Sequence, residues 1–534
     1  MKNIMRVTFF ICKINNLRLS SSMQCRAKST KNCSVDSETK NKNEQQHVRP
    51  TEDIPGPKGF IPLFGNLFRF TRYILGEYGN ADVMTEMRML HKQYGDIVKL
   101  NDLTNHRSLI FLFSPQLCEQ MYRLAGNSPI RISLESLYYY RKNRKHIYDG
   151  QYGLAVSQDK MWRDFRSRVN PYMMTPQRIK PHVMQISKVT HEFVEKMRTL
   201  RDPKTEELPR NFINELHKWS LESICSIALG CRLGCLKPNL AANSEPQIMI
   251  NCVSDAFDLM HRLDNQPSLW KVYNKRNFKK LSHVLDTINE IAHKYIRHAK
   301  EKLGETTNRI DIDCQNQSVL ENLLRIDEKT ARIMALDMLI GGIDTIGNTA
   351  GGFLYYIANN PEKQEKLRKE VMSALPSKTS LVTYDMLNQI PYAKACIKES
   401  MRIFPITMFI IRTMREDISL GGYRIPAGFN VAACHALISE SAQFPLAHEY
   451  IPERWLRDNT EFPLPTKPHP FAHMPFGYGP RTCIGKRFAE MELQILLLTI
   501  IRNFRIEWHH GPLEYKNQIT NRLTMPLRFK LIDL

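Results

Sequence analysis

Residues 471–490 read FAHMPFGYGPRTCIGKRFAE, and this stretch places Cys483 in a loop between Gly479 and Gly485. A long apolar run with helical spacing follows, so the cysteine precedes the positive end of a helix, where a thiol is biased toward thiolate. The glycines leave no side chain where a flat ligand must approach the backbone. Arg481 stands within reach of an anionic edge of such a ligand. Together these features suit the presentation of one thiolate to a haem iron.

A fixed pattern surrounds the cysteine: Phe476-x-x-Gly479-x-Arg481-x-Cys483-x-Gly485. In every fixed position it resembles the haem-binding signature of the cytochrome P450 family. A buried structural cysteine in a turn is the alternative, since cysteine is commonly buried. The resemblance implies a mainly α fold with small β-sheets, in which a single haem-thiolate domain contains a long central helix. It also implies haem b (iron protoporphyrin IX) as the cofactor, with Cys483 as its axial thiolate and metal ligand and Arg481 as a cofactor-binding residue.

Length and composition favour one large domain. The 534 residues would allow about three or four domains, yet no internal repeat or Gly/Ser-rich linker follows the start of the body. A haem-thiolate monooxygenase domain over residues 54–534 is the simpler interpretation.

The 12 cysteines lack the spacing of a disulfide framework or a zinc site, which indicates a reducing compartment. The net charge of +21 suits nucleic acid, acidic lipid or an acidic protein. No nucleic-acid-binding motif occurs, so nucleic acid is discounted as a partner.

The N-terminal segment has the composition of an organelle address. Residues 1–35 contain seven Lys or Arg and no acidic residue, which is typical of a mitochondrial transit peptide. Their longest apolar stretch, Val7–Cys12, is far shorter than the ~20 residues that span a bilayer. A disordered basic tail without an address is the alternative. Residues 36–53 are polar and are predicted to be a disordered segment.

Periodicity predicts helices and short strands in the body of the chain. Amphipathic helices are expected over residues 183–200, 212–229 and 281–303, and a β-hairpin over residues 97–100 and 109–113.

Two less regular stretches are expected beside a substrate cavity. Residues 129–148 are predicted as a loop with short helices, and residues 259–270 as a proline-bearing loop with exposed apolar side chains. In the resembled family the second area roofs the cavity and can touch a membrane, which implies peripheral contact with the inner mitochondrial membrane. Plain core helix is the alternative. By analogy alone, Met338, Ile343 and residues 406–411 are expected to line the cavity.

Trp162 and Arg166 stand at positions i and i+4, so they would share one face of a helix. An indole donor and a guanidinium one turn apart suit a carboxylate. A surface arginine packed on a tryptophan is the alternative. The pair matches the resembled family in spacing and in distance from the chain start. The resemblance therefore implies that both residues bind a haem propionate, and that Arg412 provides a second propionate contact.

Residues 327–359 form the longest uninterrupted helical pattern. Glycines 341–342 in its middle each cost about 1 kcal/mol relative to alanine, and would let a macrocycle and a small ligand lie against the backbone. Asp344 and Thr345 follow at an expected local distortion and resemble the family's oxygen-activation motif, which implies a catalytic proton relay. Ile346 departs from the many relatives that have a second hydroxyl there. A glycine packing pair beside a solvated aspartate is the alternative.

Glu399 and Arg402 lie three residues apart on a predicted helix. Such a pair is most often a surface salt bridge contributing less than about 1 kcal/mol. In the resembled family it is a structural lock, joined by an arginine from a Pro-Glu-Arg segment, which is Arg454 here. The resemblance implies that this lock holds the haem loop without taking part in the chemistry.

Four basic residues are expected near the thiolate side of the haem. Lys394 and Lys398 lie at i and i+4 of one helix, and Lys486 and Arg487 follow the cysteine. Ordinary solvated cations are the alternative. The segment around the two lysines resembles the site at which mitochondrial members dock an acidic two-iron, two-sulfur ferredoxin of the adrenodoxin type. An NADPH-dependent ferredoxin reductase would then supply the electrons.

The resemblance covers residues 54–534 and identifies the chain as similar to mitochondrial-clan cytochrome P450 enzymes of the insect type, within the branch linked to xenobiotic metabolism. It implies insertion of one oxygen atom of O2 into a lipophilic small molecule, on the matrix side of the inner mitochondrial membrane. A mitochondrial steroid (ecdysteroid-type) hydroxylase is the alternative within the enzymes. A non-oxidative haem-thiolate isomerase and a haem sensor or carrier are the others.

Replacing Cys483 with serine is expected to abolish the carbon-monoxide band that is characteristic of reduced, thiolate-ligated haem, because a protonated hydroxyl cannot replace the thiolate. Absorbance difference spectroscopy measures the band. An unchanged spectrum would exclude Cys483 as the iron ligand.

Overall fold

The computed structural model describes most of the chain from Val48 to Leu534. The described residues are 48–58, 82–101, 108–131, 134–238, 240–264, 268–271, 275–306, 318–458, 460, 462 and 467–534. The transit peptide predicted over residues 1–35 and the first part of the segment predicted to be disordered, residues 36–47, lie outside the described residues. Residues 48–534 form one compact unit.

The end of the segment predicted to be disordered, residues 48–53, is ordered instead. The backbone N–H of Arg49 donates to the carbonyl of Gly422 over 3.0 Å. The Arg49 guanidinium lies 3.9 Å from the centre of the Tyr423 ring. The prediction was wrong for these residues because pairing with a hairpin distant in sequence, rather than local composition, orders the backbone.

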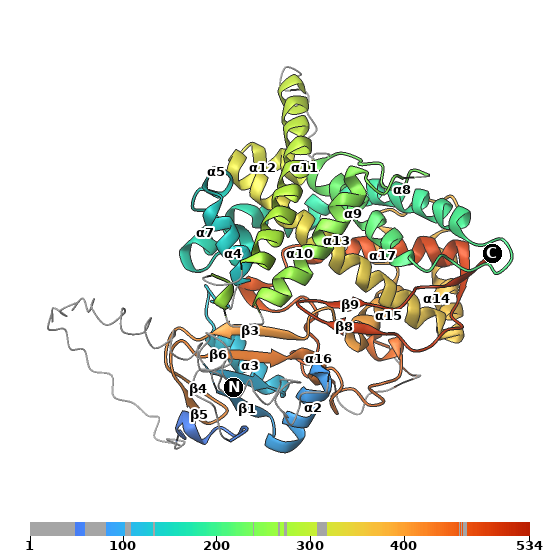
Figure 1. The fold of residues 1–534 in the computed structure, drawn as a ribbon. Helices are drawn as coiled ribbons and strands as arrows, with labels where there is room; N and C mark the ends of the chain where they lie inside the picture. The colour runs from blue at the N-terminus through green and yellow to red at the C-terminus, as the bar shows by residue number, and fades with distance from the viewer. Residues whose placement is uncertain are drawn as a thin grey trace, which may run out of the picture. The chain divides into compact units, whose positions relative to one another are not determined.

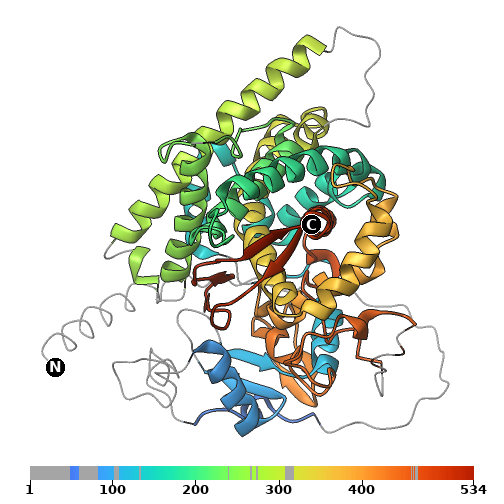
Figure 2. The same cartoon turned by 90° about the vertical axis from the view of Figure 1, so that its right-hand side faces the viewer.

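α13 (Glu328–Ala358) confirms the predicted central helix, and Figures 1 and 2 show it among the other helices. The Asp327 side chain caps its first turn by accepting from two backbone N–H groups that no helix carbonyl can reach. α13 packs extensively against α9 (Phe212–Leu229), which has the predicted bounds. The chain stays α-helical through residues 341–345, so the local distortion expected there is not found.

The remaining helices have the following bounds: η1 (Thr51–Asp53), α2 (Val83–Tyr94), α3 (Pro115–Leu124), α4 (Glu135–Asn143), α5 (Lys145–Tyr148), α6 (Gly153–Val156), α7 (Asp159–Met173), α8 (Pro176–Leu200), α10 (Glu245–Asp264), η3 (Ser268–Lys271), α11 (Arg276–Thr306), α12 (Val319–Leu324), α14 (Pro361–Ala374), η4 (Met386–Asn388), α15 (Pro391–Ile403), α16 (His435–Ile438), η5 (Pro452–Trp455), η6 (Gly479–Arg481) and α17 (Lys486–Asn503). The predicted helices over 183–200 and 281–303 are confirmed within α8 and α11, and both helices begin earlier than predicted. None of the described helices is both long and apolar enough to cross a bilayer.

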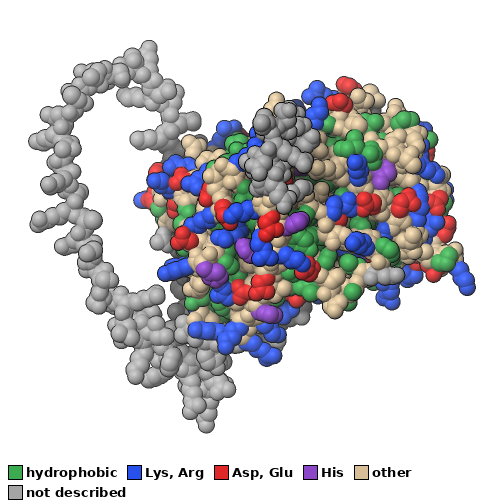
Figure 3. Space-filling model, turned by 90° about the horizontal axis from the view of Figure 1, so that it is seen from above, with side chains coloured by type: hydrophobic (Ala, Val, Ile, Leu, Met, Phe, Trp, Pro, Cys, Tyr) green, Lys and Arg blue, Asp and Glu red, His purple; other side chains and the backbone are tan. Residues whose placement is uncertain are grey.

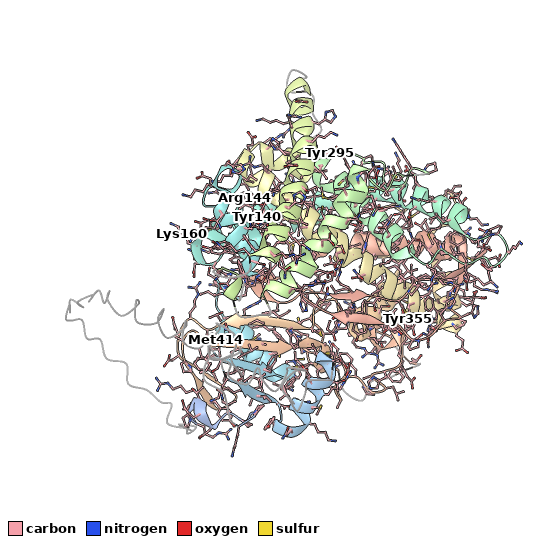
Figure 4. All side chains as sticks on the ribbon, in the orientation of Figure 1. Tyr140, Arg144, Lys160, Tyr295, Tyr355 and Met414 are labelled. Carbon is pink, nitrogen blue, oxygen red and sulfur yellow. The ribbon has the colours of Figure 1, made fainter. Side chains whose placement is uncertain are left out.

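The stretch 129–148 contains the short helices that were predicted. Tyr140 and Arg144, labelled in Figure 4, both reach Asp286 of α11. The Tyr140 hydroxyl donates to one carboxylate oxygen over 2.6 Å, and the Arg144 guanidinium donates to both oxygens over 3.0 and 2.6 Å. These bonds fasten the stretch to α11.

The stretch 259–270 is largely helical rather than a loop. Its first residues continue α10, in which Met260 and Leu263 are buried, and Trp270 in η3 is also buried. The prediction of exposed apolar side chains is therefore wrong for these residues, because the apolar face of α10 is covered by neighbouring helices, α11 among them. Pro267 lies outside the described residues.

One four-stranded sheet has the order β1-β2-β6-β3. The predicted hairpin is confirmed as β1 (Ile97–Leu100) and β2 (Leu109–Leu112), which pair antiparallel. β6 (Asn430–Cys434) runs parallel to β2, and β3 (Phe409–Thr413) runs antiparallel to β6. Three two-stranded sheets complete the described strands: β4 (Ile418–Leu420) with β5 (Tyr423–Ile425), β7 (Phe504–Glu507) with β10 (Lys530–Asp533), and β8 (Tyr515–Asn517) with β9 (Asn521–Leu523).

The core lies among α8, α9, α13 and α17. On α17 the side chains of Leu493, Leu496, Leu497 and Ile500 are at most 1% exposed. Burying each such side chain contributes about 1.5–3 kcal/mol. Because α17 begins three residues after Cys483, this burial fixes the end of the loop that carries the thiol.

Candidate functional site

The loop before α17 holds Cys483 in a defined position. The Cys483 N–H donates to the Phe476 carbonyl over 2.9 Å, which closes the loop. Gly477 and Gly479 have φ angles of +71° and +74°, a conformation that residues with a β-carbon rarely adopt. Among the described cysteines Cys483 is the only exposed one; the others are buried or intermediate. The loop therefore leaves this thiol accessible to a ligand.

The electrostatics of the thiol correct one expectation. Although its sulfur is accessible, Cys483 lies deep among protein atoms, and this burial raises its pKa above the ordinary value, while the Gly485 N–H, Arg166 and Arg131 oppose that shift. Burial is the largest cause of this pKa shift, so the protein's own groups do not give the thiol the predicted bias toward thiolate. A bound metal ion supplies the missing positive charge, since coordination deprotonates a thiol.

Open space lies against the backbone at two glycines of the site. A β-carbon added to Gly479 in the loop, or to Gly341 in the middle of α13, would meet no other atom within 4 Å. At Gly485 its nearest neighbour would be the Cys483 sulfur, at 3.9 Å. These positions provide the room that a flat macrocycle needs beside the thiol.

Four guanidinium groups gather near the thiol. Arg166, Arg412 and Arg481 are buried, with 8%, 2% and 7% exposure, and Arg131 acts electrostatically on each of them. Burial, followed by repulsion from the other three arginines, lowers the pKa of Arg481 to about 8. Burial likewise lowers the pKa values of Arg166 and Arg412 to about 10.

This arginine cluster has unfilled capacity for an anion. The Nε atoms of Arg166 and Arg412 are buried and have no hydrogen-bond partner among the described residues. Buried cations need partners of opposite charge, and guanidinium groups match carboxylates in shape. The two propionates of haem b would supply those carboxylates, so the residues present fit this cofactor. Of the four, Arg131 was not predicted, because its segment lacks any periodic pattern or motif that singles out one arginine.

Trp162 and Arg481, predicted as separate cofactor-binding residues, are in contact. The Arg481 guanidinium lies 3.9 Å from the centre of the Trp162 ring, within the range of a cation–π interaction. Arg481 also donates to the carbonyls of Pro129 and Ser157, over 3.0 Å in each case. These contacts hold the guanidinium where it faces the other three arginines.

Asp344 and Thr345 are adjacent on α13 but engage different partners. The Thr345 hydroxyl donates to the Gly341 carbonyl over 2.7 Å. The Asp344 carboxylate is 2% exposed and forms an ion pair with Arg522 of β9, at 2.7 Å. It also accepts from the hydroxyl of Thr520, at 3.1 Å.

Arg522 was not predicted, although it holds the acidic residue of the expected relay. Its guanidinium also reaches Asp258 and Ser254 of α10, at 3.0 and 2.7 Å. Asp344 is thus tied to both β9 and α10. No local signal pointed to Arg522, because it lies 178 residues from Asp344 along the chain.

The predicted lock is assembled around Glu399, whose side chain is fully buried. Arg402 donates to both carboxylate oxygens, over 2.8 and 3.0 Å. Arg454 and the Ile451 N–H donate to Oε1, over 3.0 and 3.1 Å. The indole N–H of Trp455 donates to Oε2 over 2.8 Å, which the sequence interpretation had missed. The geometry predicted for Glu399, Arg402 and Arg454 is present, with Trp455 as a further member.

The four basic residues predicted as a docking surface share one location. Lys394 and Lys398 of α15, with Lys486 and Arg487 of α17, all act electrostatically on Glu490. Lys486 lies 3.9 Å from its carboxylate. Burial raises the pKa of Glu490, against the pull of the four cations. We call this group the basic cluster; Lys398 and Arg487 are exposed.

A helical domain in which four guanidinium groups gather near one accessible cysteine thiol has the donor set of a haem-thiolate protein. Residues 54–532 match the family model described as cytochrome P450. The "Probable cytochrome P450 12a5, mitochondrial" of Drosophila melanogaster is 36% identical over 509 residues, covering 93% of this chain and 94% of that protein. "Cytochrome P450 CYP12A2" of Musca domestica is 35% identical over 548 residues, covering 100% of this chain and 99% of that protein. "Cytochrome P450 12b1, mitochondrial" of Drosophila acanthoptera is 36% identical, covering 90% of each chain.

The chain belongs to the cytochrome P450 family, whose members are monooxygenases that bind haem b through a cysteine thiolate. The predictions of fold class, enzyme class and cofactor are confirmed.

Replacing Arg131 with glutamine is expected to speed haem loss about tenfold or more, because a hydrogen bond to a charged group contributes about 1.5–3 kcal/mol. Transfer of haem to an excess of a haem-scavenging globin measures the rate. Arg163→Gln is the matched control, since it removes one cation from an exposed position of α7. Equal rates for Arg131→Gln and the unaltered chain would remove Arg131 from the site.

Proposed function

We propose that this monooxygenase oxidises lipophilic xenobiotics, with electrons from NADPH that pass through ferredoxin reductase to a two-iron, two-sulfur ferredoxin of the adrenodoxin type. The proposed electron route rests on the basic cluster. Its four cations come from α15 and from the first turn of α17, the helix that follows the Cys483 loop. An acidic, soluble partner fits such a surface, because opposite charges steer encounter and fix orientation. By contrast, basic and acidic side chains intermingle on the face seen in Figure 3.

The relatives' names support a mitochondrial setting. Two of the three relatives described above are named as mitochondrial proteins. We assign residues 1–35 to a transit peptide and place the domain on the matrix side of the inner membrane, in peripheral contact with it. This location supplies the ferredoxin, so the address and the basic cluster point to the same electron donor.

The chain's own side chains have distinct parts in the proposed reaction. Bound haem supplies an iron centre at which O2 is activated. Cys483 would bind the iron through its thiolate, and the arginine cluster would neutralise the propionates. We assign proton delivery to the Thr345 hydroxyl, which donates to the Gly341 carbonyl. The Asp344 carboxylate is ion-paired and faces β9 and α10, so it would first take up a proton from solvent and then reload Thr345 through water. Arg522 compensates the charge of Asp344 between turnovers.

The substrate is proposed to contact the apolar residues expected from analogy. Met338 and Ile343 of α13 are buried, and residues 409–411 of β3 retain partial exposure. An apolar wall with few polar groups suits a lipophilic molecule held without a fixed hydrogen-bond pattern. Spectral titration of the holoenzyme with chemically diverse lipophilic compounds tests this: binding of many compounds supports xenobiotic oxidation, and tight binding of steroids alone would favour the ecdysteroid-type alternative.

Thr345→Ala is expected to lower the product formed per NADPH by about tenfold or more, with the electrons lost as hydrogen peroxide, because the relay loses its final proton donor. Product and peroxide are quantified together. Thr349→Ala is the matched control: it removes another back-bonded hydroxyl, one turn later on α13. Unchanged coupling in Thr345→Ala would exclude the proton-delivery role.

Lys394→Glu combined with Lys398→Glu is expected to slow ferredoxin-supported turnover and to leave peroxide-supported turnover unchanged, because only the first needs docking. Rising salt should lower the ferredoxin-supported turnover rate of the unaltered enzyme and reduce the difference between its rate and that of the variant. Lys92→Glu with Lys280→Glu makes the same charge change at exposed positions of α2 and α11. Equal loss with both electron sources would indicate damage to the fold and contradict a docking role.

A further inference from the structure

One aromatic side chain, Trp455, joins three parts of the site that are separate in sequence. It contacts Lys398 of the basic cluster, the buried carboxylate of Glu399, and His473 in the segment that leads to Cys483. Trp455 is itself only partly exposed at the end of η5.

The first contact positions a docking cation. The Lys398 ammonium lies 4.0 Å from the centre of the Trp455 ring, well within cation–π distance. Lys398 keeps an exposed surface, yet the protein atoms packed around its ammonium, together with repulsion from Lys486, lower its pKa. The ring face therefore adds to the attraction of Glu490 in holding this ammonium. An ammonium already held in place loses less freedom when an acidic partner docks.

The second contact reaches the lock. The Trp455 N–H donates to Glu399 Oε2 over 2.8 Å, and Arg402 is the other donor to that oxygen among the described residues. Glu399 is fully buried, so losing one donor leaves a charged oxygen less compensated. Lys398 and Glu399 are consecutive on α15, so the indole connects the exposed and the buried sides of this helix.

The third contact reaches the stretch that carries the ligand. The His473 ring centre lies 5.0 Å from that of Trp455, in a tilted arrangement. His473 stands ten residues before Cys483, and burial holds its pKa well below the usual range, so it packs as a neutral ring. A shift of the indole would therefore displace His473 and the segment that leads to Cys483.

We propose that Trp455 is a positioning residue that couples ferredoxin docking at Lys398 to the Glu399 lock and, through His473, to the Cys483 loop. The inference rests on the proposed ferredoxin route. Binding of an acidic partner to the Lys398 ammonium would favour one orientation of the Trp455 indole. That orientation would stabilise the Cys483 loop through the contact with His473. The coupling works in both directions, since linked binding energies are reciprocal.

A double-mutant cycle on the holoenzyme tests the first link. The affinity for an acidic two-iron, two-sulfur ferredoxin is measured by calorimetry in Trp455→Leu, Lys398→Met and the double variant. Loss of the cation–π contact should make the effects non-additive, so that Lys398→Met costs at least twofold less affinity when Trp455→Leu is already present. Lys394→Met gives the matched cycle, which should be additive. An additive cycle with Lys398 would overturn the proposal.

A second measurement tests the link to the loop without using turnover. Saturating ferredoxin should slow the thermal loss of the thiolate-type carbon-monoxide band in the unaltered enzyme at least twofold. Trp455→Leu should abolish this protection. Trp455→Phe keeps a ring face over Lys398 and removes the N–H, so it should retain the affinity coupling and lose the band faster without ferredoxin. Undiminished protection in Trp455→Leu would refute the coupling.

The two levels of the proposal fail differently. If ferredoxin neither binds the unaltered enzyme nor supports its turnover, the proposed electron route fails and the coupling fails with it. If ferredoxin binds with the expected salt dependence and the Trp455 cycle is additive, the electron route stands and only the coupling is refuted.

Discussion

Four guanidinium groups share the space beside one cysteine thiol, and most of the site follows from that arrangement. Burial of the guanidinium, followed by repulsion from the other three arginines, lowers the pKa of Arg481 to about 8. A dianionic ligand edge, such as the two propionates of haem, would relieve this cost by pairing with the buried guanidinium groups. The four arginines come from α7, β3, η6 and the segment before α4. The fold therefore brings together four like charges whose mutual repulsion haem propionates would offset.

The thiolate side is organised by a second, opposite arrangement. A single carboxylate, Glu399, is buried and surrounded by donors, whereas four cations gather on the surface above it. The saturated buried carboxylate gives residues 451–455 one geometry against α15, because any other geometry would leave a charge unpaired. The cations remain available to meet a partner. Trp455 contacts a member of each group, Lys398 of the basic cluster and the Glu399 carboxylate.

The two side chains of the proposed proton relay face different partners in the structure. Asp344 and Thr345 are neighbours in sequence, yet residues one position apart on a helix point about 100° apart. The hydroxyl faces its own helix backbone, and the carboxylate faces β9 and α10. Arg522 pairs with Asp344 and also bonds to Asp258 and Ser254, so it links the proposed relay to α10.

The sequence determined what depends on local pattern: the loop around Cys483, the long helix α13 with its cap, the hairpin of β1 and β2, and the identities of most charged groups. Tertiary structure alone decided which distant groups meet. Arg131, Trp455 and Arg522 had no local signal, because their roles come from neighbours up to 178 residues away. The order of residues 48–53 and the burial of α10 were also decided by contacts across the fold. Charge and periodicity are properties of a chain, whereas the pairing and burial of a charge are properties of the surroundings that folding provides.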